Sequence, residues 1–253
     1  PSVAPVDRAR PSVTAPATPA APGASNRVVV GQPTPFGTVS GPGIQRPSND
    51  GTGNFRTFCN PSHLANDDPL VFPGQPGRAH RHLFFGNMST DAYSTAESLL
   101  SAGESTCGGG SLNRSAYWIP ALLDSSGNAV PSNGMIVYYK SGYRRGRVAH
   151  DGGIVFTNGL RILVGDQAAT APQVTNDNVW FGCAPNTTNV FNFGASMMRG
   201  QTIPTGCPAG HRLHMSLGLP GCWDGINLDS PDHRSHVAFG DYSLGCPSTH
   251  PVS

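Results

Sequence analysis

The sequence has little charge and almost no lysine. Charged residues make up 12% of the 253 residues, the formal net charge is +1, and Lys140 is the single lysine. Nucleic-acid binding depends on clustered lysine and arginine side chains that neutralise phosphates. The composition therefore argues against a nucleic acid as the partner of this protein.

Motifs that would assign a chemistry directly are also missing. No run approaches the roughly 20 apolar residues of a membrane helix. The chain has no Cys-x-x-Cys pair, no Gly-x-Ser-x-Gly elbow, no phosphate-binding loop and no dinucleotide fingerprint. We therefore expect neither a membrane span, nor a zinc ribbon, nor a typical α/β-hydrolase. Because the chain starts without Met and without a signal peptide, a mature secreted protein is the expected form.

Cysteine occurs in an even number and at wide spacing. The six cysteines are Cys59, Cys107, Cys183, Cys207, Cys222 and Cys246. In a chain rich in Gly, Ser, Thr and Asn, this pattern predicts three disulfides and an oxidising compartment. Six cysteines allow fifteen pairings. The pairing of sequence neighbours, 59 with 107, 183 with 207 and 222 with 246, is our hypothesis, and buried free thiols are the alternative.

Glycine and proline are abundant, with 32 and 24 residues, so we expect long loops between short elements. Residues 1–53 are predicted to be a Pro/Ala/Ser/Thr-rich tail and arm, with one short strand at 28–30. Residues 54–253 are predicted to form a single globular β-rich domain.

Short apolar runs bounded by turn residues predict the strands of this domain. They lie at 55–59, 115–123, 135–140, 160–166, 179–183, 213–219 and 237–239. One short helix is expected at 91–102, with Ser94 as its N-cap and Gly103 at its end. The fold class is therefore mainly β, sandwich or jelly-roll-like, with one short helix and disulfide stabilisation.

Residues 67–87 concentrate polar groups that suit catalysis. His80 and His82 would project to one face of a strand, just before the apolar residues 83–85. Asp67 and Asp68 precede them, and the prolines and glycines between fix a bent path. Together with His63, this group suits acid/base chemistry near neutral pH or metal binding. In the structural alternative, the aspartates cap a turn and the histidines bond to the backbone.

A second polar group follows Cys222. Trp223 offers a flat apolar face that fits a sugar ring, and Asp224 lies beside it. Asp229 follows, and Asp232, His233 and His236 would then put polar groups around one turn. In the structural alternative, Trp223 is a core residue packed on the Cys222 disulfide. A calcium loop is a further one, although the regular spacing of an EF-hand is absent.

We expect the two groups to meet in one cleft lined by histidine and aspartate. The predicted catalytic residues are Asp67, Asp68, His80, His82, Asp232, His233 and His236. The predicted substrate contacts are His63, Arg114, Tyr117, Trp118, Trp223 and Asp224. If a metal is bound, its ligands would be His80, His82, His233 and His236.

The reaction type stays open at this point. The chain has only two glutamates, Glu97 and Glu104, so a glycosidase would have to use paired aspartates. A polysaccharide lyase would instead use His or Tyr as base, with Arg114 or a metal neutralising a uronate.

Several motifs in order along the chain carry a resemblance to a known family. They lie at 67–77, 80–87, 113–122, 160–166, 222–236 and 246–251. The first reads Asp-Asp-Pro-Leu-Val-Phe-Pro-Gly-Gln-Pro-Gly, and the second reads His-x-His-x-Phe-Phe-Gly-Asn. Over residues 54–251 the chain resembles the domain-of-unknown-function family numbered nineteen ninety-six, found in secreted fungal and bacterial proteins. Because its fungal members are often joined to carbohydrate-binding modules, the resemblance implies a polysaccharide or cell-wall context.

These observations predict a secreted, extracellular carbohydrate-active enzyme that cleaves a cell-wall or other extracellular polysaccharide, as a glycoside hydrolase or a polysaccharide lyase. The alternative is a non-catalytic polysaccharide-binding or metal-binding module. The expected partner is a glycan and the expected state is a monomer. No cofactor is predicted with certainty, and a divalent metal stays an open alternative.

Overall fold

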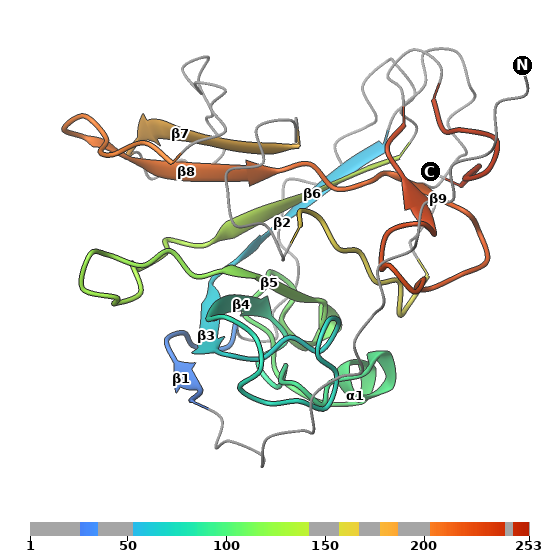
Figure 1. The fold of residues 1–253 in the computed structure, drawn as a ribbon, viewed down its shortest axis with the longest axis horizontal. Helices are drawn as coiled ribbons and strands as arrows, with labels where there is room; N and C mark the ends of the chain where they lie inside the picture. The colour runs from blue at the N-terminus through green and yellow to red at the C-terminus, as the bar shows by residue number, and fades with distance from the viewer. Residues whose placement is uncertain are drawn as a thin grey trace, which may run out of the picture.

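The computed structural model describes residues 26–34, 53–141, 157–166, 178–186, 203–240 and 245–252. In these residues the chain is mainly β, with one short helix and three disulfides, as the sequence predicts (Figure 1). Of the predicted tail and arm, only residues 26–34 and residue 53 fall within the described ranges. No helix in the described part of the chain is long and apolar enough to cross a membrane.

A four-stranded antiparallel sheet positions the first polar group. Its spatial order is β1-β3-β4-β5, and the strands are β1 (Val28–Val29), β3 (Pro61–Ala65), β4 (His82–Gly86) and β5 (Ala116–Pro120). β1 confirms the short strand that residues 28–30 predict in the arm. Pro120 is the last residue of the edge strand β5, where its missing N–H costs no ladder bond of a central strand.

The remaining strands form three antiparallel pairs. They are β2 (Gly53–Cys59) with β6 (Met135–Ser141), β7 (Val179–Pro185) with β8 (His211–Leu217), and β9 (Cys222–Trp223) with β10 (Val237–Ala238). In the view of Figure 1, the β2–β6 ribbon runs between the four-stranded sheet and the β7–β8 ribbon. The sandwich or jelly-roll arrangement of these sheets stays a prediction.

The two faces of the four-stranded sheet have different chemistry. On β4, Leu83 and Phe85 turn into the core and pack with Leu64 and the Cys59–Cys107 disulfide. Tyr117 and Ile119, opposite Phe85 and Leu83 on β5, pack against the same cluster. Since successive residues of a strand alternate in direction, His82 and Phe84 belong to the opposite face. β4 is therefore buried on both faces, and only one of them is wholly apolar.

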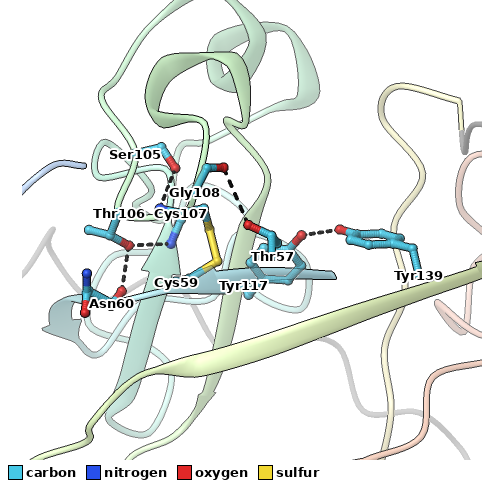
Figure 2. The surroundings of a disulfide bond; sticks show 10 residues. Thr57, Cys59, Asn60, Ser105, Thr106, Cys107, Gly108, Tyr117 and Tyr139 are labelled. Carbon is cyan, nitrogen blue, oxygen red and sulfur yellow. Dashed lines mark hydrogen bonds between the residues drawn. A yellow bond between two sulfur atoms is a disulfide. The ribbon is translucent and has the colours of Figure 1, made fainter. Parts of the chain in front are cut away.

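All three disulfides join sequence neighbours, which confirms the predicted pairing. They are Cys59–Cys107, Cys183–Cys207 and Cys222–Cys246. Figure 2 shows the first, which is fully buried, with the Thr106 hydroxyl donating to the Asn60 carbonyl at 2.6 Å beside it. The Tyr117 and Tyr139 hydroxyls bond to each other, tying β5 to β6.

The helix α1 (Ala96–Ser101) is shorter than the predicted 91–102, and its cap is a different residue. Thr95 is the N-cap, and a capping box joins it reciprocally to Ser98. Ser94, the predicted cap, instead donates its hydroxyl to the Asp91 carboxylate in the preceding turn. The helix ends at Ser101 with Ala102 as its C-cap, and Gly103 follows in the left-handed conformation with φ +88°.

The strand predicted at residues 160–166 does not form. The Arg161 N–H donates to the carbonyl of Leu228, and the Arg161 carbonyl accepts from the ring of His236. The backbone N–H and carbonyl of Arg161 are therefore satisfied by Leu228 and His236 of the C-terminal loop and not by a neighbouring strand. These two hydrogen bonds place Arg161 next to the second polar group.

Candidate functional site

The loop before β4 is held by the two aspartates that the sequence singles out. Asp68 Oδ1 accepts the N–H groups of Leu70 and Val71, both at 2.9 Å. Asp67 Oδ1 accepts the N–H of Gly77 at 2.9 Å. Both side chains are buried. Their carboxylates therefore cap the loop, as in the structural alternative raised above, and the predicted catalytic role of Asp67 and Asp68 gains no support from these contacts.

His82 is fixed at the start of β4 with one ring nitrogen left over. Its Nδ1–H donates to the carbonyl of Asp67 at 2.9 Å, so the lone pair lies on Nε2. Nε2 makes no hydrogen bond to any described residue. Burial lowers the pKa of His82 although the Asp67 contact opposes that shift, so the ring is neutral at pH 7. The exposed ring of His80 lies beside it, with ring centroids 4.3 Å apart.

A row of stacked rings continues from these histidines across the sheet. Phe84 is fully buried between His63, whose ring stacks at 4.5 Å, and Trp118, whose ring lies at 5.9 Å. We call His63, His80, His82, Phe84 and Trp118 the histidine face. Of its members, His80 is exposed and Trp118 is half-buried, so these two are the ones a ligand reaches most directly.

His63 is a core histidine and not the predicted substrate contact. It is fully buried, and its Nδ1 bonds to the Ser62 hydroxyl at 2.8 Å. Burial, helped by the nearby charge of Arg27, lowers its pKa from 6.5 to about 4. The ring is therefore neutral and inaccessible, and its role is to pack on Phe84.

Two further predicted substrate contacts also serve the fold. Arg114 donates from Nε to the carbonyl of Gly103 at 2.9 Å and from a terminal nitrogen to that of Leu100 at 3.2 Å. It thus satisfies carbonyls at the C-terminal end of α1. Tyr117 packs on the apolar core with its hydroxyl bound to Tyr139. Neither side chain belongs to the histidine face.

In the C-terminal region, His233 and Asp229 form a hydrogen-bonded dyad. His233 Nδ1–H donates to Asp229 Oδ1 at 2.8 Å, and Arg161 donates to Oδ2 of the same carboxylate at 3.2 Å. Burial alone would raise the pKa of Asp229, but the bonds from His233, the Ser230 N–H and Arg161 outweigh it and lower that pKa. The carboxylate is therefore ionised at neutral pH and orients the imidazole.

The backbone at His233 is strained. Its φ is +56°, the single positive value of a non-glycine residue among those that the structure describes. Such a conformation costs about 1–3 kcal/mol and persists where surrounding contacts over-determine it. His233 Nε2 makes no hydrogen bond to a described residue, and the side chain is 25% exposed. The strained turn thus holds a partly exposed imidazole whose Nε2 has no hydrogen bond within the described residues.

Asp232 and His236 support this turn instead of joining the dyad. Asp232 Oδ1 accepts from the Ser230 hydroxyl and from the N–H groups of Arg234 and Ser235, and these bonds hold its pKa well below the ordinary value. His236 is buried with both nitrogens used, one on the Ser230 hydroxyl at 2.8 Å and one on the Arg161 carbonyl at 2.6 Å. With every polar atom of the ring engaged, His236 is a positioning residue.

Trp223 and Asp224 are likewise engaged in local structure. Asp224 Oδ1 accepts the N–H groups of Ile226 and Asn227, which fixes a turn. Trp223 donates its ring N–H to the Asn227 carbonyl at 2.6 Å and pairs with β10 and Val252. The indole is half-buried, so part of it stays available to a ligand.

Among the residues that the structure describes, no hydrogen bond or ion pair joins the two polar groups into the expected single cleft. Within the described ranges, the hydrogen bonds and ion pairs of the histidine face and those of the dyad stay separate. In the same ranges, no three His, Cys, Asp or Glu side chains have an arrangement that holds a metal ion. The proposed four-histidine metal set is therefore not gathered at one point.

Sequence reasoning missed Asp229 and Arg161 as site residues. The i, i+4 spacing of Asp229 and His233 was a usable signal. Arg161 had none of its own, since it meets Asp229 across 68 residues of sequence.

Comparison with known proteins assigns this chain to a family. The model for a domain of unknown function, DUF1996, matches residues 68–253. The chain belongs to the DUF1996 family. No curated protein and no solved structure matches it. The match spans most of the histidine face and the whole dyad region, but the family description names no activity, so the function of this DUF1996 chain has to be argued from its site.

Proposed function

We propose that this DUF1996 chain is a secreted enzyme that cleaves an extracellular or cell-wall polysaccharide by lyase chemistry, with His233 as the base. The observation that carries the proposal is the 2.8 Å bond from His233 to Asp229, which leaves Nε2 without a hydrogen bond to a described residue on a partly exposed ring. An ionised carboxylate on Nδ1–H fixes the ring tautomer and makes Nε2 the proton acceptor.

The neighbouring cation suits an acidic sugar. The Arg161 side chain is 45% exposed although it pairs with Asp229. A guanidinium in that position can bind the carboxylate of a uronate and stabilise the charge that develops next to it. His233 Nε2 would then take the proton from C5 of the uronate. The C4–O bond breaks, a C4=C5 double bond forms, and the leaving oxygen takes up a proton.

The occupied aspartates favour this route over hydrolysis by paired carboxylates. A glycosidase needs two carboxyl groups flanking the scissile bond. Asp67, Asp68 and Asp232 instead accept hydrogen bonds from their own loops. A histidine base with an arginine at its side needs no such pair.

Secretion and a monomeric state are part of the same proposal. Three disulfides are typical of proteins that mature in an oxidising compartment. The cell-wall context rests on the resemblance to this family, because its fungal members are often joined to carbohydrate-binding modules.

The test is product release from uronate-rich and neutral polysaccharides. We expect ultraviolet-absorbing unsaturated oligosaccharides from a uronate polymer, and a loss of about 100-fold or more in His233→Gln. His211→Gln, at an exposed histidine on β8, is the matched control and should keep full activity. Release of saturated products with new reducing ends would show that the protein is a hydrolase and not a lyase. Binding of a polysaccharide without release of any product would show that the protein is a binding module and not an enzyme.

A further inference from the structure

We propose that His80 and His82 form a binding site for a divalent transition-metal ion, best suited to copper(II), apart from the His233–Asp229 dyad. The two rings lie with centroids 4.3 Å apart and planes tilted by 50°. Their two-residue spacing puts both rings on one side of the chain, with the exposed imidazole of His80 beside the buried one of His82. Neutral imidazole is a favoured ligand of copper and zinc.

The environment of His82 is that of an oriented metal ligand. Metal-binding histidines typically donate the second ring N–H to a carbonyl or carboxylate, which fixes the ring and raises its basicity. His82 does this with its Nδ1–H and the Asp67 carbonyl at 2.9 Å. Its Nε2 makes no bond to a described residue. The carbonyl itself belongs to the loop that Asp67 and Asp68 cap, so the ring direction is set by the fold.

The ring separation agrees with two ligands on one ion. A metal–nitrogen bond of about 2.0 Å puts each ring centroid about 3 Å from the ion. Two such ligands at about 90° then have centroids about 4.4 Å apart, and at a tetrahedral angle about 5 Å apart. The observed 4.3 Å is close to the separation expected for two imidazoles at about a right angle on one ion, as in a tetragonal site. That geometry and the order of affinities among divalent ions both favour copper(II).

Charge and access complete the site. The carboxylates of Asp67 and Asp68 lie close enough to act electrostatically on His82, and their negative charge offsets that of a cation. His80 is exposed, so the ion can enter from solution. No group of three protein ligands exists among the described residues, so water would fill the other positions. We therefore expect an exchangeable ion and not a structural one.

The experiment titrates the metal-free full chain with copper(II) chloride, followed by calorimetry and electron paramagnetic resonance. We expect a tetragonal signal with imidazole nitrogen coupling, and tighter binding of copper(II) than of zinc(II). In His80→Ala the affinity should fall at least tenfold and the coupling of one nitrogen should disappear. His211→Ala is the control and should bind like the wild type.

His80 is the better position to change because its exposed side chain leaves the fold intact, which near-ultraviolet circular dichroism checks. His82→Gln is the second variant and should also lose the site. The proposal is overturned if His80→Ala binds copper(II) with wild-type affinity and spectrum. Loss of copper(II) binding in His80→Ala, with copper(II) binding retained in His233→Gln, supports the site and separates it from the dyad.

Discussion

At the scale of single residues, the contacts of the two ring nitrogens decide what each histidine does. His63 is buried and stacked, and His236 has both nitrogens bonded. In His82 and His233, Nδ1 forms a hydrogen bond, whereas Nε2 forms none with a described residue. His80 is exposed. The sequence indicated that histidines matter here. It could not separate these roles, because hydrogen bonds to distant backbone and carboxylate groups assign them.

The buried His63 predicts a loss of stability in weak acid. Its pKa is about 4 in the fold and 6.5 ordinarily, so between these values the unfolded chain binds more protons. Stability therefore falls as the pH drops from 6.5 to 4, by about 3 kcal/mol for this group. In His63→Phe, which keeps the stack on Phe84, urea denaturation at several pH values should show a correspondingly shallower fall. Burial also lowers the pKa of His82 and His214, so part of the slope remains. An unchanged slope would contradict the assignment.

The cap at Asp68 predicts a defined local cost. Asp68→Ala leaves the buried N–H groups of Leu70 and Val71 without an acceptor, so the free energy of unfolding should fall by about 1–2 kcal/mol. Asp68→Asn keeps one oxygen acceptor and should lose less. Denaturant titration measures both. Equal losses would mean that the charge, and not the hydrogen bonds, matters.

At the scale of elements, the alternation along β4 organises the first group. Leu83 and Phe85 enter the core while His82 and Phe84 build the histidine face. Short apolar runs bounded by turn residues made most strands predictable from the sequence. The segment 160–166 shows the limit, since its apolar run is that of a strand but its backbone bonds to the loop at Leu228 and His236. Whether a partner strand is available is a property of the tertiary fold.

Phe84 is the centre of that element, and its removal should be costly. Phe84→Ala opens a cavity between the rings of His63 and Trp118, so we expect a loss of about 3–5 kcal/mol in unfolding free energy. Phe84→Leu fills most of the space and should cost clearly less. Urea denaturation compares the two. Similar losses from both variants would show that ring stacking, and not volume, dominates.

At the scale of the whole molecule, each of the three disulfides joins a strand to a loop, from β2 to Cys107, from β7 to Cys207 and from β9 to Cys246. The even number of cysteines predicted disulfides, and the structure confirms neighbour pairing, which was one hypothesis among fifteen possible pairings. The His233–Asp229–Arg161 arrangement was not predicted. Its members come from segments 68 residues apart that only the folded chain brings together. The predicted site residues included His233 but not Asp229 and Arg161, which lie beside it in the fold.

The disulfides should differ in how much each one stabilises the folded protein. Cys59–Cys107 closes a separation of 48 residues and Cys183–Cys207 one of 24, which correspond to about 4 and about 3.5 kcal/mol of chain entropy. The first is also fully buried in the core. Replacing both cysteines of a pair by alanine should therefore lower the melting temperature more for 59/107 than for 183/207. The opposite order would contradict this ranking.

The most direct test of the proposed function compares the wild type with Asp229→Asn on a uronate polysaccharide, by the absorbance of unsaturated products. If Asp229 orients His233, kcat should fall about 100-fold or more with little change in KM. If the wild type releases unsaturated product and Asp229→Asn turns over at the same rate, the dyad is not the catalytic base, and the account of this site is wrong.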